Sequence, residues 1–430
     1  MPFYLGLIIA IINYIVLLKN EEKGLILFSV LFVTCPVTII GSISLYYSYL
    51  FLPFLLIWAI THPQNYYDRP MFVLGPLMIY FCITIFATAF SSINNIGKVN
   101  YFSFIGILRY LIILAILSTR KHFQQNFIKI LKCIVLINVF AITIELLLLQ
   151  IWTYDSVVQL WLKLYGTLGN SGSLDSIMEF GSLGRLQGTF ASSAFPGTLS
   201  YVGIGMFLLN YFKERKWSSI FMILCSIYIG FASASKRFFL GAVVIVAICM
   251  IIKLLWGKNL HSDYKFGILL GVAFITVSYL YVTLSENLGI EYYADYLLRG
   301  DFIGSTDTRF GEDGVVNSMI PYIEKYWLFG LGETIIENVL VTDSAFYITL
   351  FSTGILGMIA FIVMFVNLII RALSIKNVYV YIILYTIMFE YIISNEFFSS
   401  LGIFFLAFAT ATCNHRKHRS VKTALPLQHN

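Results

Sequence analysis

Apolar segments long enough to cross a lipid bilayer recur along almost the whole chain, and they constrain the fold more than any other feature. A membrane-spanning helix needs roughly 20 mostly apolar residues, and about thirteen segments satisfy that length. The stretch 24–61 is too long for one span, and we divide it because Pro36, Gly41 and Pro53 offer break points. The expected spans are 3–18, 25–43, 45–60, 71–90, 101–117, 127–150, 195–212, 217–232, 238–256, 266–284, 345–371, 377–393 and 397–413.

The composition excludes a soluble protein. Hydrophobic residues make up 59% of the 430-residue chain and charged residues only 12%, whereas a soluble protein carries roughly 25% charged residues. These charges are too few to cover a surface that faces water, which argues against a secreted enzyme, a disordered protein or a nucleic-acid-binding protein. The sequence therefore predicts an all-α integral membrane protein with about 12–13 transmembrane helices.

Lysine and arginine residues in short loops predict the orientation, because such loops stay in the cytoplasm. The C-terminal tail carries Arg416, Lys417, Arg419 and Lys422, and counting back from it places the loops near 371–376, 253–265, 213–216 and 120–121 on the same side. The long loops 153–194 and 285–343 then face outward. The sidedness of the N-terminal spans stays open.

This topology divides the chain into consecutive parts. They are an N-terminal transmembrane bundle (1–152), an outer loop (153–194), helices that carry a Ser233–Arg237 hairpin (195–284), a large acidic outer loop (285–343), C-terminal transmembrane helices (344–413) and a basic cytoplasmic tail (414–430).

The outer loop 285–343 holds eleven of the 22 carboxylates of the chain. Within it, apolar residues recur at about 3.6-residue spacing, which predicts an amphipathic helix. The helix is interpreted either as a cover packed on the spans or as a lid over a site at the lipid–water boundary. Its apolar stripe consists of Val315, Val316, Met319, Ile320, Ile323, Tyr326 and Trp327.

Several cations are expected near the outer surface, where positive charge is disfavoured. Lys236 and Arg237 occupy a tight outer hairpin, Arg299 and Arg309 lie in the acidic loop, and Arg185 lies in the first outer loop. Snorkelling to lipid headgroups or salt bridges with nearby Asp residues would explain some of them. Alternatively, guanidinium groups bind phosphate through paired hydrogen bonds.

Asp343 precedes the span 345–371 at its outer end, where it suits either a helix cap or a general base. Glu145 and Glu390 are weaker candidates at outer ends of spans. We find no metal-binding, nucleotide-binding or serine-hydrolase motif, so we expect no metal and no cofactor. Arginines beside a carboxylate at the outer leaflet suggest glycosyl transfer from a lipid-diphosphate donor.

At these residues the chain resembles the O-antigen polymerase and O-antigen ligase superfamily of bacterial membrane proteins. The resemblance covers roughly residues 185–360. It is carried by Arg185–Phe190 with Phe195-Pro196, by Ser233–Arg237, by Arg309 to Gly332 ending in Tyr326-Trp327-Leu328-Phe329-Gly330-Leu331-Gly332, and by Asp343–Tyr347 with Gly354–Gly357.

The resemblance implies a helical membrane glycosyltransferase of the GT-C-like type in the bacterial inner membrane. Its active site would face the periplasm and bind glycans linked to undecaprenyl diphosphate, without metal. Carried over by motif, Arg237 and Arg309 would hold the diphosphate, and Arg185 would assist or order the loop. Lys236 and Arg299 are further candidates for binding the substrate. Asp343 stands where ligases are expected to carry a His, which favours a polymerase.

We therefore expect a polysaccharide (O-antigen) polymerase of lipopolysaccharide biosynthesis, with Asp343, Arg309 and Arg237 as catalytic residues. Its expected partners are lipid-linked repeat units, membrane lipids and, through the resemblance, a polysaccharide chain-length regulator, but no nucleic acid. The alternatives are an O-antigen ligase that transfers polymer to lipid A–core and a lipid-linked oligosaccharide flippase.

Overall fold

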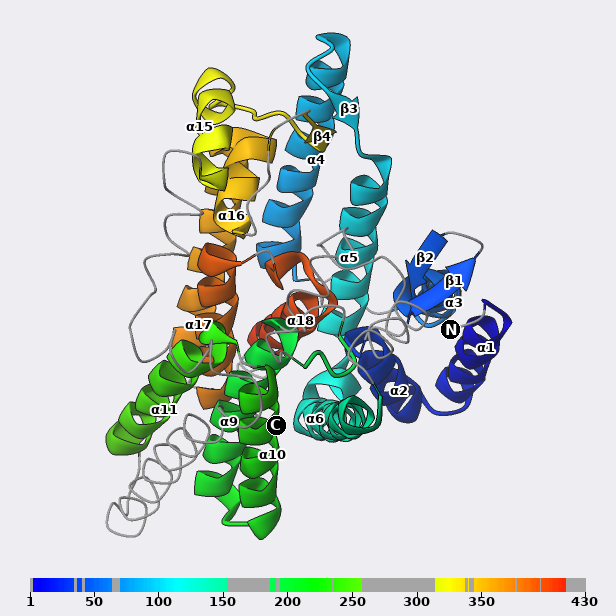
Figure 1. Ribbon diagram of the computed structural model, residues 1–430, viewed down its shortest axis with the longest axis vertical. Coiled ribbons are helices and arrows are strands. Elements are labelled where there is room, and N and C mark those ends of the chain that lie inside the picture. Colours follow the sequence, from blue (N-terminus) through cyan, green and yellow to red (C-terminus); the bar gives the residue numbers. More distant parts are fainter. Residues whose placement is uncertain are drawn as a thin grey trace, which may run out of the picture. The chain divides into compact units, whose positions relative to one another are not determined.

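The computed structural model of the chain is helical (Figure 1). Thirteen α-helices, a short 3-10 helix and two pairs of short strands form the regular structure of the described residues. These residues form two compact units: unit 1 comprises residues 1–51 and 128–302, and unit 2 comprises residues 52–127 and 303–430. The described residues are 3–34, 37–40, 43–63, 70–152, 186–190, 194–233, 235–256, 314–336, 339, 344–375, 377–394 and 396–414.

Most of the expected spans correspond to single α-helices, because each is apolar over several consecutive turns. The span 266–284 lies outside the described residues. The confirmed helices are α1 (Phe3–Lys19), α3 (Tyr47–Thr61), α4 (Met71–Ile93), α5 (Tyr101–Thr119), α6 (Lys121–Ile151), α9 (Ala194–Glu214), α10 (Trp217–Ser233), α11 (Lys236–Trp256), α16 (Ala345–Ile375), α17 (Val378–Ile393) and α18 (Ser400–Asn414).

The expected span 25–43 is wrong. Its helix, α2 (Glu21–Val33), ends early, and an antiparallel pair of strands follows, β1 (Val37–Ile40) and β2 (Ile43–Tyr46). Proline has no N–H to continue a helix, and Pro36 stands at this boundary in the sequence. The β-branched residues after it favour an extended backbone. An apolar run of suitable length therefore contains a helix and a hairpin instead of one span.

Three helices of the described part of the chain are long and apolar enough to cross a membrane alone. They are α4, α6 over Lys121–Leu148, and α16. Shorter apolar helices, among them α1, α3, α10, α17 and α18, accompany them. The three long helices suggest a multi-pass membrane protein.

In unit 1, α9 packs closely against α10 and α11. Gly203 of α9 faces the Ser226 side chain of α10, and Gly241 of α11 faces the Tyr201 ring of α9. A Cβ at either glycine would overlap these neighbours. Small residues allow helices in membranes to approach closely.

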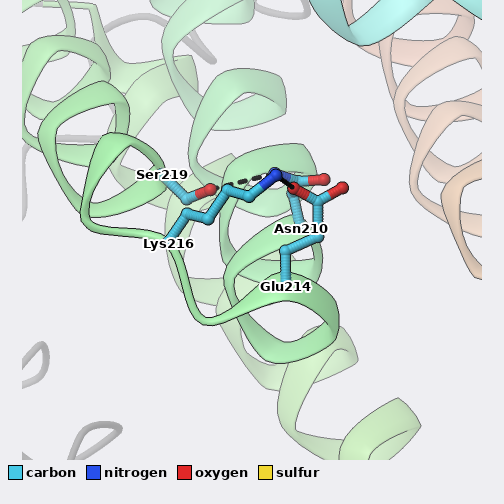
Figure 2. A network of polar contacts seen from close by, with 4 residues as sticks. All are labelled: Asn210, Glu214, Lys216 and Ser219. Carbon is cyan, nitrogen blue, oxygen red and sulfur yellow. Dashed lines mark hydrogen bonds and ion pairs between the residues drawn. The ribbon is translucent and has the colours of Figure 1, made fainter.

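The turn between α9 and α10 is held by polar contacts (Figure 2). Lys216 Nζ lies 3.0 Å from Glu214 Oε2, and Asn210 Nδ2 donates to Ser219 Oγ at 2.9 Å. Arg215 adopts a left-handed backbone conformation between the two helices, with φ 56°. This turn is one of those that the charge pattern assigns to the cytoplasm.

In unit 2, α4 packs along α16, α5 packs along α18, and α17 packs against both α16 and α18. Near the end of α16, the Arg371 guanidinium lies 3.8 Å from the centroid of the Phe72 ring, and Asn367 Nδ2 donates to the Phe72 carbonyl. Phe72 belongs to the first turn of α4, so α4 and α16 run antiparallel. The beginning of α16 therefore lies toward the end of α4.

The helix α16 is broken at Gly354, which has φ 60° and ψ −157°. The break separates donors and acceptors that would pair in a continuous helix, and the segment Trp327–Gly332 fills it. Four backbone hydrogen bonds join this segment to α16: Leu331 N–H to Phe351 O (2.9 Å), Gly332 N–H to Ser352 O (2.7 Å), Ile355 N–H to Trp327 O (2.8 Å) and Leu356 N–H to Leu328 O (3.3 Å).

Three glycines make this junction possible. Gly330, Gly332 and Gly354 all have φ between 60° and 68°, a region that other residues rarely adopt. Space is also restricted, because a Cβ on Gly330 would lie 2.5 Å from the backbone of Ser352 and Thr353. The glycines of the quoted motifs therefore have a structural role at the crossing of two segments.

We predict that Gly330→Ala lowers the free energy of unfolding by at least about 2 kcal/mol, because it adds left-handed strain to a backbone clash. Gly75→Ala in α4 is the matched control, since a Cβ there meets nothing within 4 Å. The control should be neutral or stabilising by up to about 1 kcal/mol. Thermal unfolding of both variants in detergent micelles tests this, and equal stabilities would contradict it.

Candidate functional site

Most of the side chains predicted to form the site lie outside the described residues. These are Arg185, Arg299, Arg309 and Asp343. The other two begin α11: Lys236 is its first residue, with a side chain outside the described part, and Arg237 is partly buried and engaged with neighbouring groups. The described part of the site therefore consists of the segments that adjoin these positions.

Unit 1 brings the first two motif segments together. The Leu186 N–H donates to the carbonyl of Ala232 at the end of α10 with a length of 3.0 Å. In the same region, a Cβ on Gly197 of α9 would lie 2.7 Å from Ser235 Cβ. The segment that follows Arg185 thus lies against the hairpin that leads to Arg237.

Two polar side chains of α6 hold the segment Leu186–Phe190. Glu145 Oε2 accepts hydrogen bonds from the N–H groups of Gln187 and Gly188, both at 3.1 Å. Asn138 Oδ1 accepts from the N–H and the hydroxyl of Thr189. Glu145, a weak catalytic candidate by sequence, therefore anchors a loop.

The other two motif segments meet in unit 2, at the break in α16. The expected amphipathic helix is present as α15 (Val315–Lys325), and its Val316 and Met319 are buried. Met319 packs with Leu331 and Phe351, which makes α15 a packed cover over this junction. The end of the apolar stripe stays at the surface, since Trp327 is 54% exposed.

The beginning of α16 is attached to the end of α17. Ser344 Oγ donates to the Ile392 carbonyl at 2.6 Å, and the Ala345 N–H donates to the Ser394 carbonyl at 2.9 Å. The Ser344 carbonyl accepts the first helical hydrogen bond from Ile348. Ser344 therefore occupies the cap position that the sequence offered to Asp343, which precedes it by one residue.

A cavity of about 280 Å³ opens beside the segment that fills the break. It contains Glu333, which directly follows Gly332 and which the sequence analysis did not single out. The only local signal was its place after the glycine pair of the motif. The cavity is lined by Tyr80, Asn100, Ser103, Ile107, Gly332–Ile336, Val339, Ile348, Phe351, Ser352 and Phe398.

The backbone of Glu333 is fixed on both sides. Its N–H donates to Thr88 Oγ1 of α4 at 2.9 Å, and its carbonyl accepts from the Asn100 N–H at 2.8 Å. The next residues pair with the chain before α5, as β3 (Lys98–Val99) and β4 (Thr334–Ile335). These contacts hold the carboxyl group at the first turn of α5.

The Ser103 hydroxyl donates a hydrogen bond to the Glu333 carboxylate. Burial raises the pKa of this carboxyl above its ordinary value, and the Ser103 hydrogen bond opposes the rise only in part. Among the described residues that line the cavity there is no lysine, arginine or histidine. The described walls therefore present an acid without a matching cation.

The described residues contain no group of three or more His, Cys, Asp or Glu side chains that would hold a metal ion. The described carboxylates Glu145, Glu333 and Glu390 have separate surroundings, with Glu390 Oε2 accepting a hydrogen bond from Ser394 Oγ at 2.6 Å.

Comparison with known proteins finds no protein-family model that matches this chain. No curated protein matches it either. The resemblance to the O-antigen polymerase and ligase superfamily thus depends on the motif segments themselves.

We predict that Glu333→Gln stabilises the protein increasingly as the pH rises above the ordinary glutamate pKa. In that range the wild-type carboxyl ionises in the unfolded chain before it does in the folded one, so ionisation favours unfolding. The stability difference between Glu333→Gln and the wild type should become constant once the pH exceeds the raised pKa of the folded state.

Melting temperatures of the two proteins between pH 4 and 8 measure the effect. Glu324→Gln, which removes an exposed carboxyl from α15, is the control. A Glu333→Gln difference that is the same at every pH would contradict the raised pKa.

Proposed function

We propose that this protein is a membrane glycosyltransferase that polymerises a polysaccharide. It transfers the growing glycan from undecaprenyl diphosphate to a new lipid-linked repeat unit at the outer face of the bacterial inner membrane. The observation that carries the proposal is the insertion of Trp327–Gly332 into the break of α16. Through this insertion, two segments that carry the resemblance, one ending at Gly332 and one containing Gly354, form a single junction.

The same arrangement supports a role for the loop that carries Arg309 and Asp343. The described chain resumes after Arg309 at Gly314, which leads into α15, and after Asp343 at Ser344. Because α15 packs on α16 and Ser344 directly precedes α16, the segments that follow Arg309 and Asp343 are both tied to one helix. A loop anchored in this way can present an arginine and a carboxylate to one substrate.

In the proposed reaction, Asp343 takes the proton from an acceptor hydroxyl of the new repeat unit. The oxygen attacks the anomeric carbon of the growing chain, and the bond from this carbon to the diphosphate breaks. Arg309 and Arg237 stabilise the negative charge that develops on the departing diphosphate, with Arg185, Lys236 and Arg299 binding the substrate. The reaction inverts the anomeric carbon and requires no metal.

The packing within unit 2 agrees with the proposed orientation. Arg371, which the charge pattern assigns to the cytoplasm, contacts Phe72 at one end of the α4–α16 pair. Glu333 contacts Thr88, which belongs to the last two turns of α4. The cavity thus belongs to the end of the pair that faces outward in the proposed topology of about 12–13 spans.

A broken helix is also a feature of transporters, in which the freed backbone groups bind the cargo or its coupling ion. Here the carbonyls of Phe351 and Ser352 and the N–H groups of Ile355 and Leu356 bind the 327–332 segment instead. These groups are occupied, which favours the glycosyltransferase over a flippase.

The decisive experiment uses purified protein in lipid vesicles, supplied with lipid-linked repeat units alone. We predict a ladder of glycans that a chelator does not affect. Arg309→Ala should reduce the rate of polymerisation by about 100-fold or more, since it removes a group that stabilises the leaving diphosphate. Lys121→Ala is the matched control, because it removes one exposed positive charge from the expected cytoplasmic side.

A full ladder from Arg309→Ala protein would remove this residue from the site. Absence of a ladder, with transfer of preformed polymer once lipid A–core is added, would identify a ligase. Movement of repeat units across the bilayer without any bond formation would identify a flippase.

A further inference from the structure

The cavity beside Glu333 has an unusual combination of walls for an outer-facing membrane protein. One carboxylate stands among neutral polar groups, which are the Ser103 and Ser352 hydroxyls, the Asn100 amide and the Tyr80 hydroxyl. Isoleucine, valine and phenylalanine side chains complete the lining. A matching ligand therefore supplies hydrogen-bond donors to the carboxylate and apolar surface to the isoleucine, valine and phenylalanine side chains.

One lining hydroxyl has unused hydrogen-bonding capacity. Ser352 Oγ is buried and makes no well-formed hydrogen bond with the described residues, although the Tyr80 hydroxyl lies beside it. Buried polar atoms usually have a partner in the protein, in water or in a ligand. Ser352 belongs to the last helical turn before the break in α16, so the cavity reaches the junction itself.

The walls also provide an aromatic surface. The Phe398 ring lines the cavity and stacks on Tyr80, with centroids 5.8 Å apart and an interplanar angle of 22°. An aromatic face packs well against the C–H groups of a sugar ring, and a carboxylate accepts strong hydrogen bonds from its hydroxyls. A single sugar residue presents both kinds of surface.

Other ligand classes fit less well. A phosphate or another anion would meet the Glu333 carboxylate, and the described lining residues offer it no cation. A divalent cation would find a single carboxylate among these described residues, whereas such ions in proteins usually bind several oxygen ligands with compensating charge. A purely apolar ligand would cover the partly buried carboxylate and supply no hydrogen-bond donor beyond Ser103.

We propose that the Glu333 cavity binds the terminal sugar of the acceptor repeat unit, and that Glu333 accepts hydrogen bonds from its hydroxyls. This assignment depends on the proposed function, and it identifies the acceptor side of the site. The volume of about 280 Å³ lies just below the usual range of ligand pockets, roughly 300–1,000 Å³. This volume suits one sugar ring and not a longer segment of the glycan.

The position of Glu333 fits a residue that holds the acceptor in place. Its backbone is fixed by Thr88 and Asn100 and its carboxylate is hydrogen-bonded by Ser103, so the side chain is restrained before the ligand arrives. Fixed groups lose little conformational freedom on binding, which favours affinity. The raised pKa of the free carboxyl also agrees with a described lining that contains no cation, and hydroxyl donors would stabilise the charged form.

The first test measures binding without turnover. Glycan released by mild acid from lipid-linked repeat units is added to the purified full-length protein in micelles, and its contact with the protein is followed by saturation-transfer NMR. We expect the wild type to bind and Glu333→Gln to bind about tenfold or more weakly, because a charge-assisted hydrogen bond is lost. Glu324→Gln is the control and should bind as the wild type does.

A second variant leaves the carboxylate in place. Ile107→Phe adds volume to the wall of the cavity and should weaken binding to a similar degree if the sugar occupies this space. Unchanged binding in both Glu333→Gln and Ile107→Phe would overturn the assignment, and so would the absence of glycan binding by the wild type.

The polymerisation assay separates this inference from the proposed function. We expect Glu333→Gln to raise the KM for lipid-linked repeat unit about tenfold while kcat changes much less. A wild-type ladder with an unchanged KM in the variant would overturn the cavity assignment and leave the polymerase intact. A missing wild-type ladder, together with glycan binding that depends on Glu333, would instead overturn the polymerase and keep the cavity as a sugar site.

Discussion

Four backbone hydrogen bonds across the break in α16 are the interaction on which the rest of unit 2 depends. A helix interrupted within a membrane protein leaves donors and acceptors that hydrocarbon cannot satisfy. Here the segment Trp327–Gly332 supplies partners for two carbonyls and two N–H groups at the break. The segment Trp327–Gly332 stabilises the interrupted helix by bonding backbone groups that the break frees. The same hydrogen bonds hold this segment in a defined conformation.

The cavity follows from this junction. After Gly332 the chain turns toward α4 and α5, where Thr88 and Asn100 bind the backbone of Glu333. A carboxyl group is thereby placed in a partly enclosed space whose described lining contains no cation, an arrangement that disfavours its charged form. An acid with a perturbed pKa in a partly enclosed space is typical of functional sites.

The sequence predicted the helices well because an apolar run of sufficient length leaves the backbone few alternatives in a membrane. It also predicted α15, since the 3.6-residue spacing of Val316 and Met319 reflects their common burial. It failed at Val37–Tyr46, where a hairpin and a spanning helix share the same apolar composition. The break in α16 was missed for another reason. Gly354 can adopt either a helical or a left-handed backbone, and the residues that bond to the helix at the break lie more than twenty positions earlier in the sequence.

Glu333 illustrates the limit of local patterns for the site. Eleven carboxylates lie in the loop 285–343, and nothing in the immediate neighbourhood of Glu333 distinguishes its chemistry. Its environment comes from Thr88, which is 245 positions away, and from Ser103. The arginines, by contrast, were found from the side of the membrane that they are expected to occupy, and their roles remain predictions.

The direction of chain growth tests the central claim most directly. Purified protein in vesicles is first given unlabelled lipid-linked repeat units and then a short pulse of labelled ones, after which the glycan is released and sequenced from its reducing end. If the growing chain is transferred to each new unit, the label lies at the reducing end, next to the former lipid attachment. Label at the nonreducing end, or no incorporation at all, would contradict the proposed reaction.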